Sequence, residues 1–178
     1  MTQPTSPIGS KLLGGSIFPS FDVPRFGGGR IRIGGKRKRW TLLIVYRGKH
    51  CGRCKTYLNK FETSYTDWER AGFDVACISA DPLKKLTDDV ENFGWTFDMG
   101  YGLQENDMRR MGLYVSDPLS SHETDQRFAE PGVFCIRPDG TAQIIAISNG
   151  PAARPDLDEL LGGMIFTIEN DRPARGTV

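Results

Sequence analysis

The run from Trp40 to Tyr46 constrains the fold more than any other segment, because it carries no charge and is rich in β-branched residues. Such a run is typical of a strand that is buried on both faces of a parallel or mixed sheet. Large side chains then recur at helical spacing, at Tyr57, Leu58, Phe61, Tyr65 and Trp68. A buried strand followed by an amphipathic helix, which we expect to start at about Cys51, predicts the first half of a βαβ unit.

The same alternation continues downstream. Residues 73–80 form a second apolar run, which predicts another strand. Asp81 is expected to cap the helix that follows, with Pro82 in its first position. The buried stripe of that helix is predicted to consist of Leu83, Leu86, Val90 and Phe93. Strand, helix, strand and helix in this order imply parallel strands joined by right-handed crossovers.

Two hairpins and a closing helix complete the predicted elements. Residues 132–136 and 141–147 are apolar runs joined by Arg137-Pro138-Asp139-Gly140, which has the residues of an antiparallel turn. A shorter hairpin is predicted upstream from residues 21–26 and 30–33, which flank three glycines. The closing helix has an apolar face made of Leu157, Leu160, Leu161, Met164, Ile165 and Ile168.

This order of elements is that of a thioredoxin fold. We therefore predict an α/β, thioredoxin-like fold in which helices flank a central mixed β-sheet, with an N-terminal β-hairpin extension. Residues 1–13 are expected to be a flexible tail, and residues 14–178 to form a single domain. A domain of this size buries enough surface to fold without disulfides.

Composition limits the location and the partners. The first ten residues lack the charged start and apolar run of a signal peptide, and no apolar run is long enough to span a bilayer. We therefore expect a cytoplasmic protein without a membrane partner. The net charge of +1 gives no general argument for nucleic acid. The basic residues between Arg30 and Arg39 are interpreted as a solvated hairpin edge, and no nucleic-acid partner is expected.

The pair Cys51 and Cys54 is the main candidate for chemistry, because it lies where a buried strand gives way to a helix. Unpaired N–H groups and the positive end of the helix dipole favour a thiolate there. Lys49, His50, Arg53 and Lys55 add positive charge nearby. We predict that Cys51 is the nucleophile and that Cys54, one helical turn on, is the resolving thiol. This requires that the sulfurs lie together and reach solvent.

A C-x-x-C pair is also half of a zinc site, which needs two further ligands. The candidates are Cys77, Cys135, His50 and His122. Cys77 and Cys135 lie inside apolar strands and are interpreted as core residues. Inert structural cysteines are the other alternative. Redox chemistry is favoured, because the pair adjoins a βαβ pattern, and no metal or cofactor is expected.

Three further positions are predicted to support the site. Pro131 opens a strand, and we expect a cis Glu130-Pro131 bond that exposes backbone groups of Glu130 to an extended substrate. Arg47 either steers an anionic substrate or stabilises a thiolate, or it forms a surface ion pair. His50 either tunes the pKa of the nucleophile or shuttles a proton, or it shields the pair as a bulky neighbour.

With these residues in view, the chain resembles the redoxin group that includes the alkyl hydroperoxide reductase and thiol-specific antioxidant (AhpC/TSA) family, in the peroxiredoxin-like branch with an RGxxCxxC active site. The resemblance runs from about Gly14 to Gly176. The motifs that carry it are Tyr46-Arg47-Gly48-x-x-Cys51-x-x-Cys54, Ser79-Ala80-Asp81, Phe128-Ala129-Glu130-Pro131-Gly132, and an ending from Arg154-Pro155-x-Leu157 to Arg172-Pro173-Ala174-Arg175-Gly176.

The resemblance implies an antioxidant oxidoreductase that acts on an oxidised protein or a peroxide. It implies a reductant such as thioredoxin or glutathione, and a monomer or homodimer. True peroxiredoxins carry a hydroxyl residue three positions before the peroxide-attacking cysteine and an arginine before the strand at residues 132–136. Here Cys51 and Pro131 stand at those positions, and Cys54 aligns with the peroxide-attacking cysteine.

These departures favour thiol-disulfide exchange, with Cys51 and Cys54 cycling between dithiol and disulfide. A thiol peroxidase is the alternative. A second alternative, from another class, is a non-catalytic redox-sensing or metal-binding module on the same scaffold.

Overall fold

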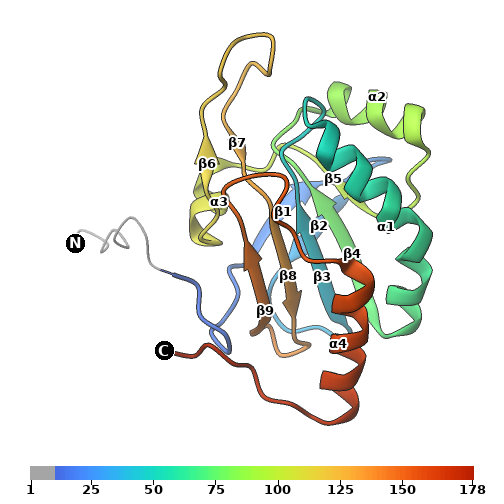
Figure 1. The fold of residues 1–178 in the computed structure, drawn as a ribbon, viewed down its shortest axis with the longest axis vertical. Helices are drawn as coiled ribbons and strands as arrows, with labels where there is room; N and C mark the ends of the chain where they lie inside the picture. The colour runs from blue at the N-terminus through green and yellow to red at the C-terminus, as the bar shows by residue number, and fades with distance from the viewer. Residues whose placement is uncertain (1–10) are drawn as a thin grey trace.

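The computed structural model describes residues 11–178. A five-stranded mixed sheet forms its centre, in the order β5-β4-β3-β8-β9 (Figure 1). β3 (Trp40–Val45), β4 (Phe73–Ile78) and β5 (Met99–Gly100) run parallel, whereas β8 (Gly132–Ile136) and β9 (Ala142–Ile147) add antiparallel strands on the other side of β3. The mixed sheet predicted from the sequence is confirmed.

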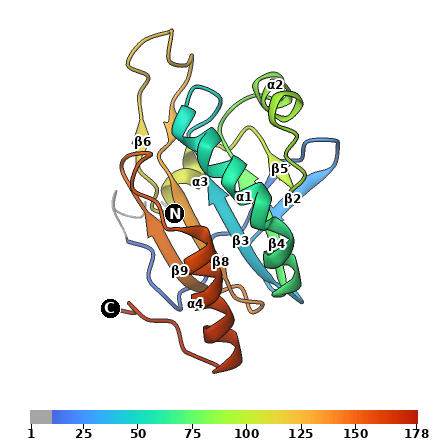
Figure 2. The same cartoon turned by 45° about the vertical axis from the view of Figure 1, so that its right-hand side comes forward.

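Helices cover the sheet as the alternation predicted. Figure 2 shows α1 (Gly52–Arg70) and α4 (Leu157–Glu169) lying side by side across one face. α2 (Leu83–Phe93) and α3 (Glu105–Arg110) follow β4 and β5. The core under α1 and α4 is built from buried side chains of both helices and the sheet, among them Leu42, Ile44, Leu58, Phe61, Leu161 and Met164. The apolar faces of these two helices therefore pack against β3 and the neighbouring strands.

The opposite face of the sheet is covered by the N-terminal hairpin and α3. β1 (Phe21–Pro24) pairs antiparallel with β2 (Arg30–Ile33), as the sequence predicted. Val23 and Ile33 of this hairpin pack in one buried cluster with β3 residues of the second face. β3 thus buries both of its faces, which is why its sequence shows no polar alternation.

The start of α2 differs from the prediction. Pro82 is the N-cap and makes no side-chain cap, whereas the Asp81 carboxylate accepts the N–H of Lys49 at 2.6 Å. Of the predicted stripe, Leu86 is buried, but Leu83 and Phe93 are 44% and 38% exposed. These corrections share a cause: Asp81 is used to hold the loop before the cysteines, and only the middle of α2 reaches the core.

A projecting arm lies near one end of the sheet. Its base is the two-stranded sheet of β6 (Val115–Ser116) and β7 (Phe128–Ala129), and the intervening loop extends away from the body (Figure 1). This loop, residues 117–127, consists mostly of polar and charged residues. Most of the predicted N-terminal tail, residues 1–10, lies outside the described residues, and Leu12 packs against the second core cluster. Within residues 11–178, no helix has the length and apolarity to cross a membrane.

Candidate active site

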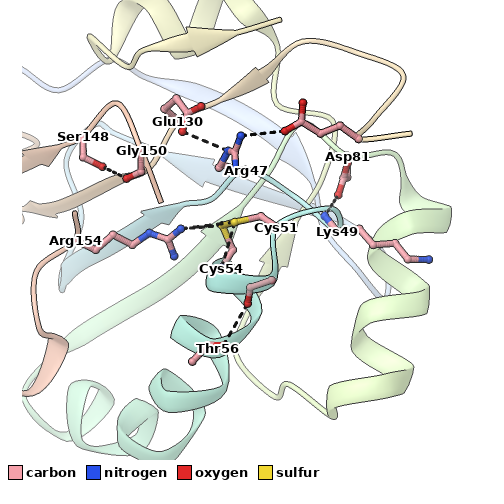
Figure 3. Close-up of a disulfide and its surroundings, with 12 residues drawn as sticks. Arg47, Lys49, Cys51, Cys54, Thr56, Asp81, Glu130, Ser148, Gly150 and Arg154 are labelled. Atoms are coloured by element: carbon pink, nitrogen blue, oxygen red, sulfur yellow. Dashed lines mark hydrogen bonds and ion pairs between the residues drawn. A yellow bond between two sulfur atoms is a disulfide. The ribbon is translucent and has the colours of Figure 1, made fainter. Parts of the chain in front are cut away.

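The two cysteines lie at the start of α1, directly after β3. Cys51 is the N-cap, and its Sγ accepts the backbone N–H of Cys54 at 3.2 Å. The two sulfurs are joined in a disulfide, with the Cα atoms 5.2 Å apart (Figure 3). The placement at a helix N-terminus, which was predicted from the strand-to-helix transition, brings the pair together as thiol chemistry requires.

The loop between β3 and α1 is held by a buried carboxylate. Gly48 has a φ of +127°, and a Cβ there would lie 2.5 Å from the Asp81 Oδ2 atom, so only glycine fits. Asp81 is 3% exposed, and burial raises the pKa of its carboxyl group, which the hydrogen bond from Lys49 opposes. This hydrogen bond fixes the backbone two residues before Cys51.

Both cysteines are covered in this disulfide-bonded form. Cys51 is 3% exposed and Cys54 is fully buried. The requirement that the sulfurs lie together is met, whereas the requirement that they reach solvent is not met here. Attack on either sulfur therefore needs a local movement of the residues that cover the pair.

Arg154 is the functional residue that the sequence reasoning missed. Its Nη2 atom lies 2.8 Å from the Cys54 Sγ and 3.9 Å from the Cys51 Sγ. Figure 3 shows the side chain reaching from the segment between β9 and α4 toward both sulfurs. Its Nε and Nη1 atoms are buried and have no hydrogen-bond partner among residues 11–178. A cation at this distance favours a thiolate, above all on Cys54.

Arg154 is 100 residues from Cys54 in the sequence, so no local pattern joins them. The only sequence signal for Arg154 was that Arg154-Pro155 belongs to the C-terminal motif that the chain shares with the family it resembles. Peroxiredoxins were expected to supply an arginine at the position of Pro131, and here a guanidinium reaches the sulfurs from a different segment. Burial lowers the pKa of Arg154, with Tyr57 opposing that effect.

Arg47 makes ion pairs with two carboxylates. Its Nη2 atom lies 3.2 Å from Glu123 Oε1, and its Nε atom lies 3.3 Å from Glu130 Oε2. The guanidinium also sits 4.7 Å from the ring centroid of Phe128. The side chains of Arg47 and Glu130 are 18% and 6% exposed, so this is a mostly buried contact between the loop before Cys51 and the projecting arm. Arg47 therefore forms an ion pair, as one interpretation expected, but the pair is mostly buried and does not lie at the surface.

The prediction of a cis Glu130-Pro131 bond is wrong, because no peptide bond within residues 11–178 is cis. The Glu130 N–H donates to the Tyr114 carbonyl at 2.8 Å, and the Pro131 carbonyl accepts the Ser148 N–H at 3.1 Å. The backbone of this segment is thus tied to its neighbours and is not free to pair with an extended substrate. Pro131 precedes β8, where its missing N–H leaves no ladder bond unmade.

The remaining predicted residues take different positions. His50 packs its ring 4.6 Å from that of Phe128, and its Nε2 atom is buried without a partner among the described residues. Burial, with help from Arg47, lowers the pKa of His50, which favours its neutral form. Arg53 is exposed and lines a groove of about 380 Å³ between α1 and the segment that carries Arg154.

The other two cysteines are not part of the disulfide and lie in strands of the same buried core cluster as Cys51 and Cys54. Cys77 in β4 and Cys135 in β8 are both fully buried free thiols. Burial raises the pKa of each well above its ordinary value. Within residues 11–178, no group of three or more His, Cys, Asp or Glu side chains is arranged to hold a metal ion.

Comparison with known families gave a match between residues 15–145 and the model of the AhpC/TSA family. Comparison with curated protein sequences gave no match. Among solved structures, the peroxiredoxin-like protein from Aquifex aeolicus is 19% identical, with a TM-score of 0.74, and 88% of each chain is covered.

Two proteins of Mycobacterium tuberculosis are similar as well. AhpC is 14% identical with a TM-score of 0.73, covering 92% of this chain and 96% of its own. Peroxidoxin BcpB is 16% identical with a TM-score of 0.69, covering 90% of this chain and 99% of its own. Likeness at these identities concerns the fold, and it confirms the predicted thioredoxin-like class.

Proposed function

Because the chain belongs to the AhpC/TSA family, it is a thiol-dependent oxidoreductase, and we propose that it catalyses thiol-disulfide exchange through Cys51 and Cys54. The observation that carries the proposal is the pair itself. The two sulfurs are bonded at a helix N-terminus, and the Arg154 guanidinium contacts the Cys54 sulfur, which is the inner one of the two. The activity is assigned to residues 14–178 as one redoxin domain.

The proposed cycle begins with the reduced pair. The Cys51 thiolate attacks one sulfur of a substrate disulfide, which forms a mixed disulfide and releases the other substrate sulfur as a thiolate. The Cys54 thiolate then attacks the Cys51 sulfur, so that the remaining substrate sulfur leaves. Two electrons have moved to the substrate, and the protein holds the Cys51–Cys54 disulfide. A thiol reductant such as thioredoxin or glutathione restores the dithiol.

Arg154 has a defined part in both directions. During reduction of the protein, an incoming thiolate attacks Cys51 and Cys54 must leave as a thiolate. A leaving thiol with a lower pKa leaves faster, and a cation 2.8 Å from the Cys54 sulfur lowers that pKa. During substrate reduction, the same cation keeps Cys54 ionised for its attack on the mixed disulfide.

The surroundings of the pair support further assignments. Arg47, Glu130 and Pro131 are proposed to hold the walls of the site, and His50 to act as a neutral cover. Arg53 is proposed to meet substrate at the rim, because it is exposed beside the pair. We further propose a cytoplasmic location, an oxidised protein as substrate, and function as a monomer or homodimer.

The proposal is tested with the reduced protein in rapid mixing against a protein disulfide and, separately, against hydrogen peroxide. We expect faster oxidation by the protein disulfide. In steady state, the protein should reduce insulin disulfides faster than dithiothreitol alone does. Equal rates with and without the protein would overturn the proposal.

A thiol peroxidase is the second candidate, and one observation favours it. Arg154 touches Cys54, which aligns with the peroxide-attacking cysteine of peroxiredoxins, more closely than it touches Cys51. In this cycle the Cys54 thiolate attacks a peroxide oxygen, becomes a sulfenic acid and releases water or an alcohol. Cys51 then displaces water to form the disulfide. Peroxide consumption that survives Cys51→Ser but not Cys54→Ser would select this candidate.

A further inference from the structure

Tyr57 makes two contacts with the segment that carries Arg154. It lies on α1, three residues after Cys54, and its ring faces the segment between β9 and α4. The Tyr57 hydroxyl donates a hydrogen bond to the Pro155 carbonyl at 2.9 Å. The Arg154 guanidinium carbon lies 4.9 Å from the centroid of the Tyr57 ring. One side chain therefore holds both the backbone next to Arg154 and the guanidinium itself.

The guanidinium has few other fixed partners. Its Nη2 atom contacts the two sulfurs, whereas Nε and Nη1 are buried and unpaired among residues 11–178. Arg47 and Glu130, whose charges act on Arg154, are already engaged with each other. Since no carboxylate within the described residues accepts from Arg154, the ring face and the Pro155 anchor are the contacts that define where its charge sits.

We propose that Tyr57 is a positioning residue that holds the Arg154 guanidinium against the Cys54 sulfur and thereby favours the thiolate of Cys54. Tyr57 touches neither sulfur and acts through Arg154. The proposal rests on the proposed role of Arg154 and deepens it, since it names the residue that fixes the cation. A cation held on a ring face stays close to a desolvated sulfur, whereas a loose arginine side chain turns toward water.

The test is the pKa of the Cys54 thiol, measured from thiolate absorbance near 240 nm in the Cys51→Ser background. Cys77 and Cys135 stay silent below pH 9, because burial raises the pKa of both. Arg154→Met removes the cation, and we expect it to raise the Cys54 pKa by about 1–3 units. This is the largest shift against which the Tyr57 variants are compared. Arg47, Glu130 and His50 are the same in every variant.

Two variants separate the contacts of Tyr57. Tyr57→Leu removes the aromatic face and the hydroxyl, and should raise the Cys54 pKa by at least half as much as Arg154→Met does. Tyr57→Phe keeps the face and loses only the anchor, so its shift should be smaller than that of Tyr57→Leu. Circular dichroism and the unfolding midpoint identify folded variants, and Tyr57→Phe remains informative if Tyr57→Leu does not fold.

The decisive comparison is made in the Arg154→Met background. If Tyr57 acts through Arg154, neither substitution at Tyr57 changes the Cys54 pKa further. An unchanged Cys54 pKa in both Tyr57 variants, or an equal shift with and without Arg154, would overturn the proposal. Exchange activity is not used as a readout, so failure of the thiol-disulfide assignment leaves this test intact.

Discussion

The chain has two pairs of cysteines, and burial does not distinguish them. Cys51 and Cys54 are as deeply covered as Cys77 and Cys135. The difference is electrostatic: the first pair lies at a helix N-terminus with a guanidinium on its inner sulfur, whereas the second lies in mid-strand among apolar side chains. Burial alone raises a thiol pKa, and a fixed cation reverses that effect. We therefore expect reactivity to follow the charged partners of each sulfur and not its exposure.

The largest expected difference between the two pairs of cysteines is in turnover. We expect Cys51→Ser to abolish reduction of insulin disulfides, and Cys54→Ser to accumulate a mixed disulfide, because the resolving thiol is missing. Cys135→Ala is the matched control and should keep turnover close to wild type. Mass spectrometry of non-reduced protein reports the trapped adduct. Turnover that depends on Cys135 would reverse the assignment of the two pairs.

Removing the cation should make the first pair resemble the second. Arg154→Met is expected to lower turnover about 10- to 100-fold, because the leaving thiolate loses its counter-charge. The reduction potential should fall by about 30 mV for each unit by which the Cys54 pKa rises, since the cation stabilises the reduced form. Equilibration with a glutathione buffer measures this potential.

Arg172→Met is the matched control for Arg154→Met. Arg172 is also an arginine over an aromatic ring, 5.9 Å from the Phe166 centroid, but it lies at the far end of α4. Its substitution should leave both turnover and potential unchanged. A similar loss in both variants would show that the effect of Arg154→Met is general to the fold.

The buried thiols of the second pair should matter for stability alone. Cys77→Ser and Cys135→Ser place a hydroxyl in an apolar environment, and each is expected to lower the free energy of unfolding by about 1–3 kcal/mol. Turnover should be retained, because burial keeps both thiols protonated and neither takes part in the proposed cycle. Urea unfolding followed by circular dichroism measures the loss. If the serine variants are as stable as wild type, the environment of these cysteines is more polar than the structure indicates.

The smallest effect is expected at Asp81, the buried carboxylate behind the cysteine loop. Burial raises its folded-state pKa above the ordinary 3.8, so its contribution to stability is present below that value and is lost as pH rises through the folded pKa. Asp81→Asn keeps an acceptor for the Lys49 N–H and cannot ionise. Its stability relative to wild type should therefore increase from about pH 4 upward and then level off. A difference that is constant with pH would contradict the raised pKa.

The sequence allowed most of the fold to be predicted, because β3, α1 and α4 bury continuous or periodic apolar faces. The predicted cap of α2 was wrong, because an aspartate carboxylate can accept N–H groups either from a helix end or from a distant loop. Only the folded chain shows which of these Asp81 contacts. The sequence identified Cys51 and Cys54 from spacing and position. Arg154 could not be connected to them, because contacts across 100 residues leave no local pattern. No local pattern indicates the trans bond at Pro131, where the flanking backbone bonds to Tyr114 and Ser148.

The most direct test of the central claim is a redox titration of the whole protein, followed by acid quenching, denaturation and alkylation of all free thiols. Mass spectrometry then reports the state of each cysteine. We expect Cys51 and Cys54 to change together as a two-electron couple, with about 30 mV for each tenfold change in ratio, while Cys77 and Cys135 remain thiols throughout. A pair that never forms the Cys51–Cys54 disulfide, or a disulfide that involves Cys77 or Cys135, would contradict the account.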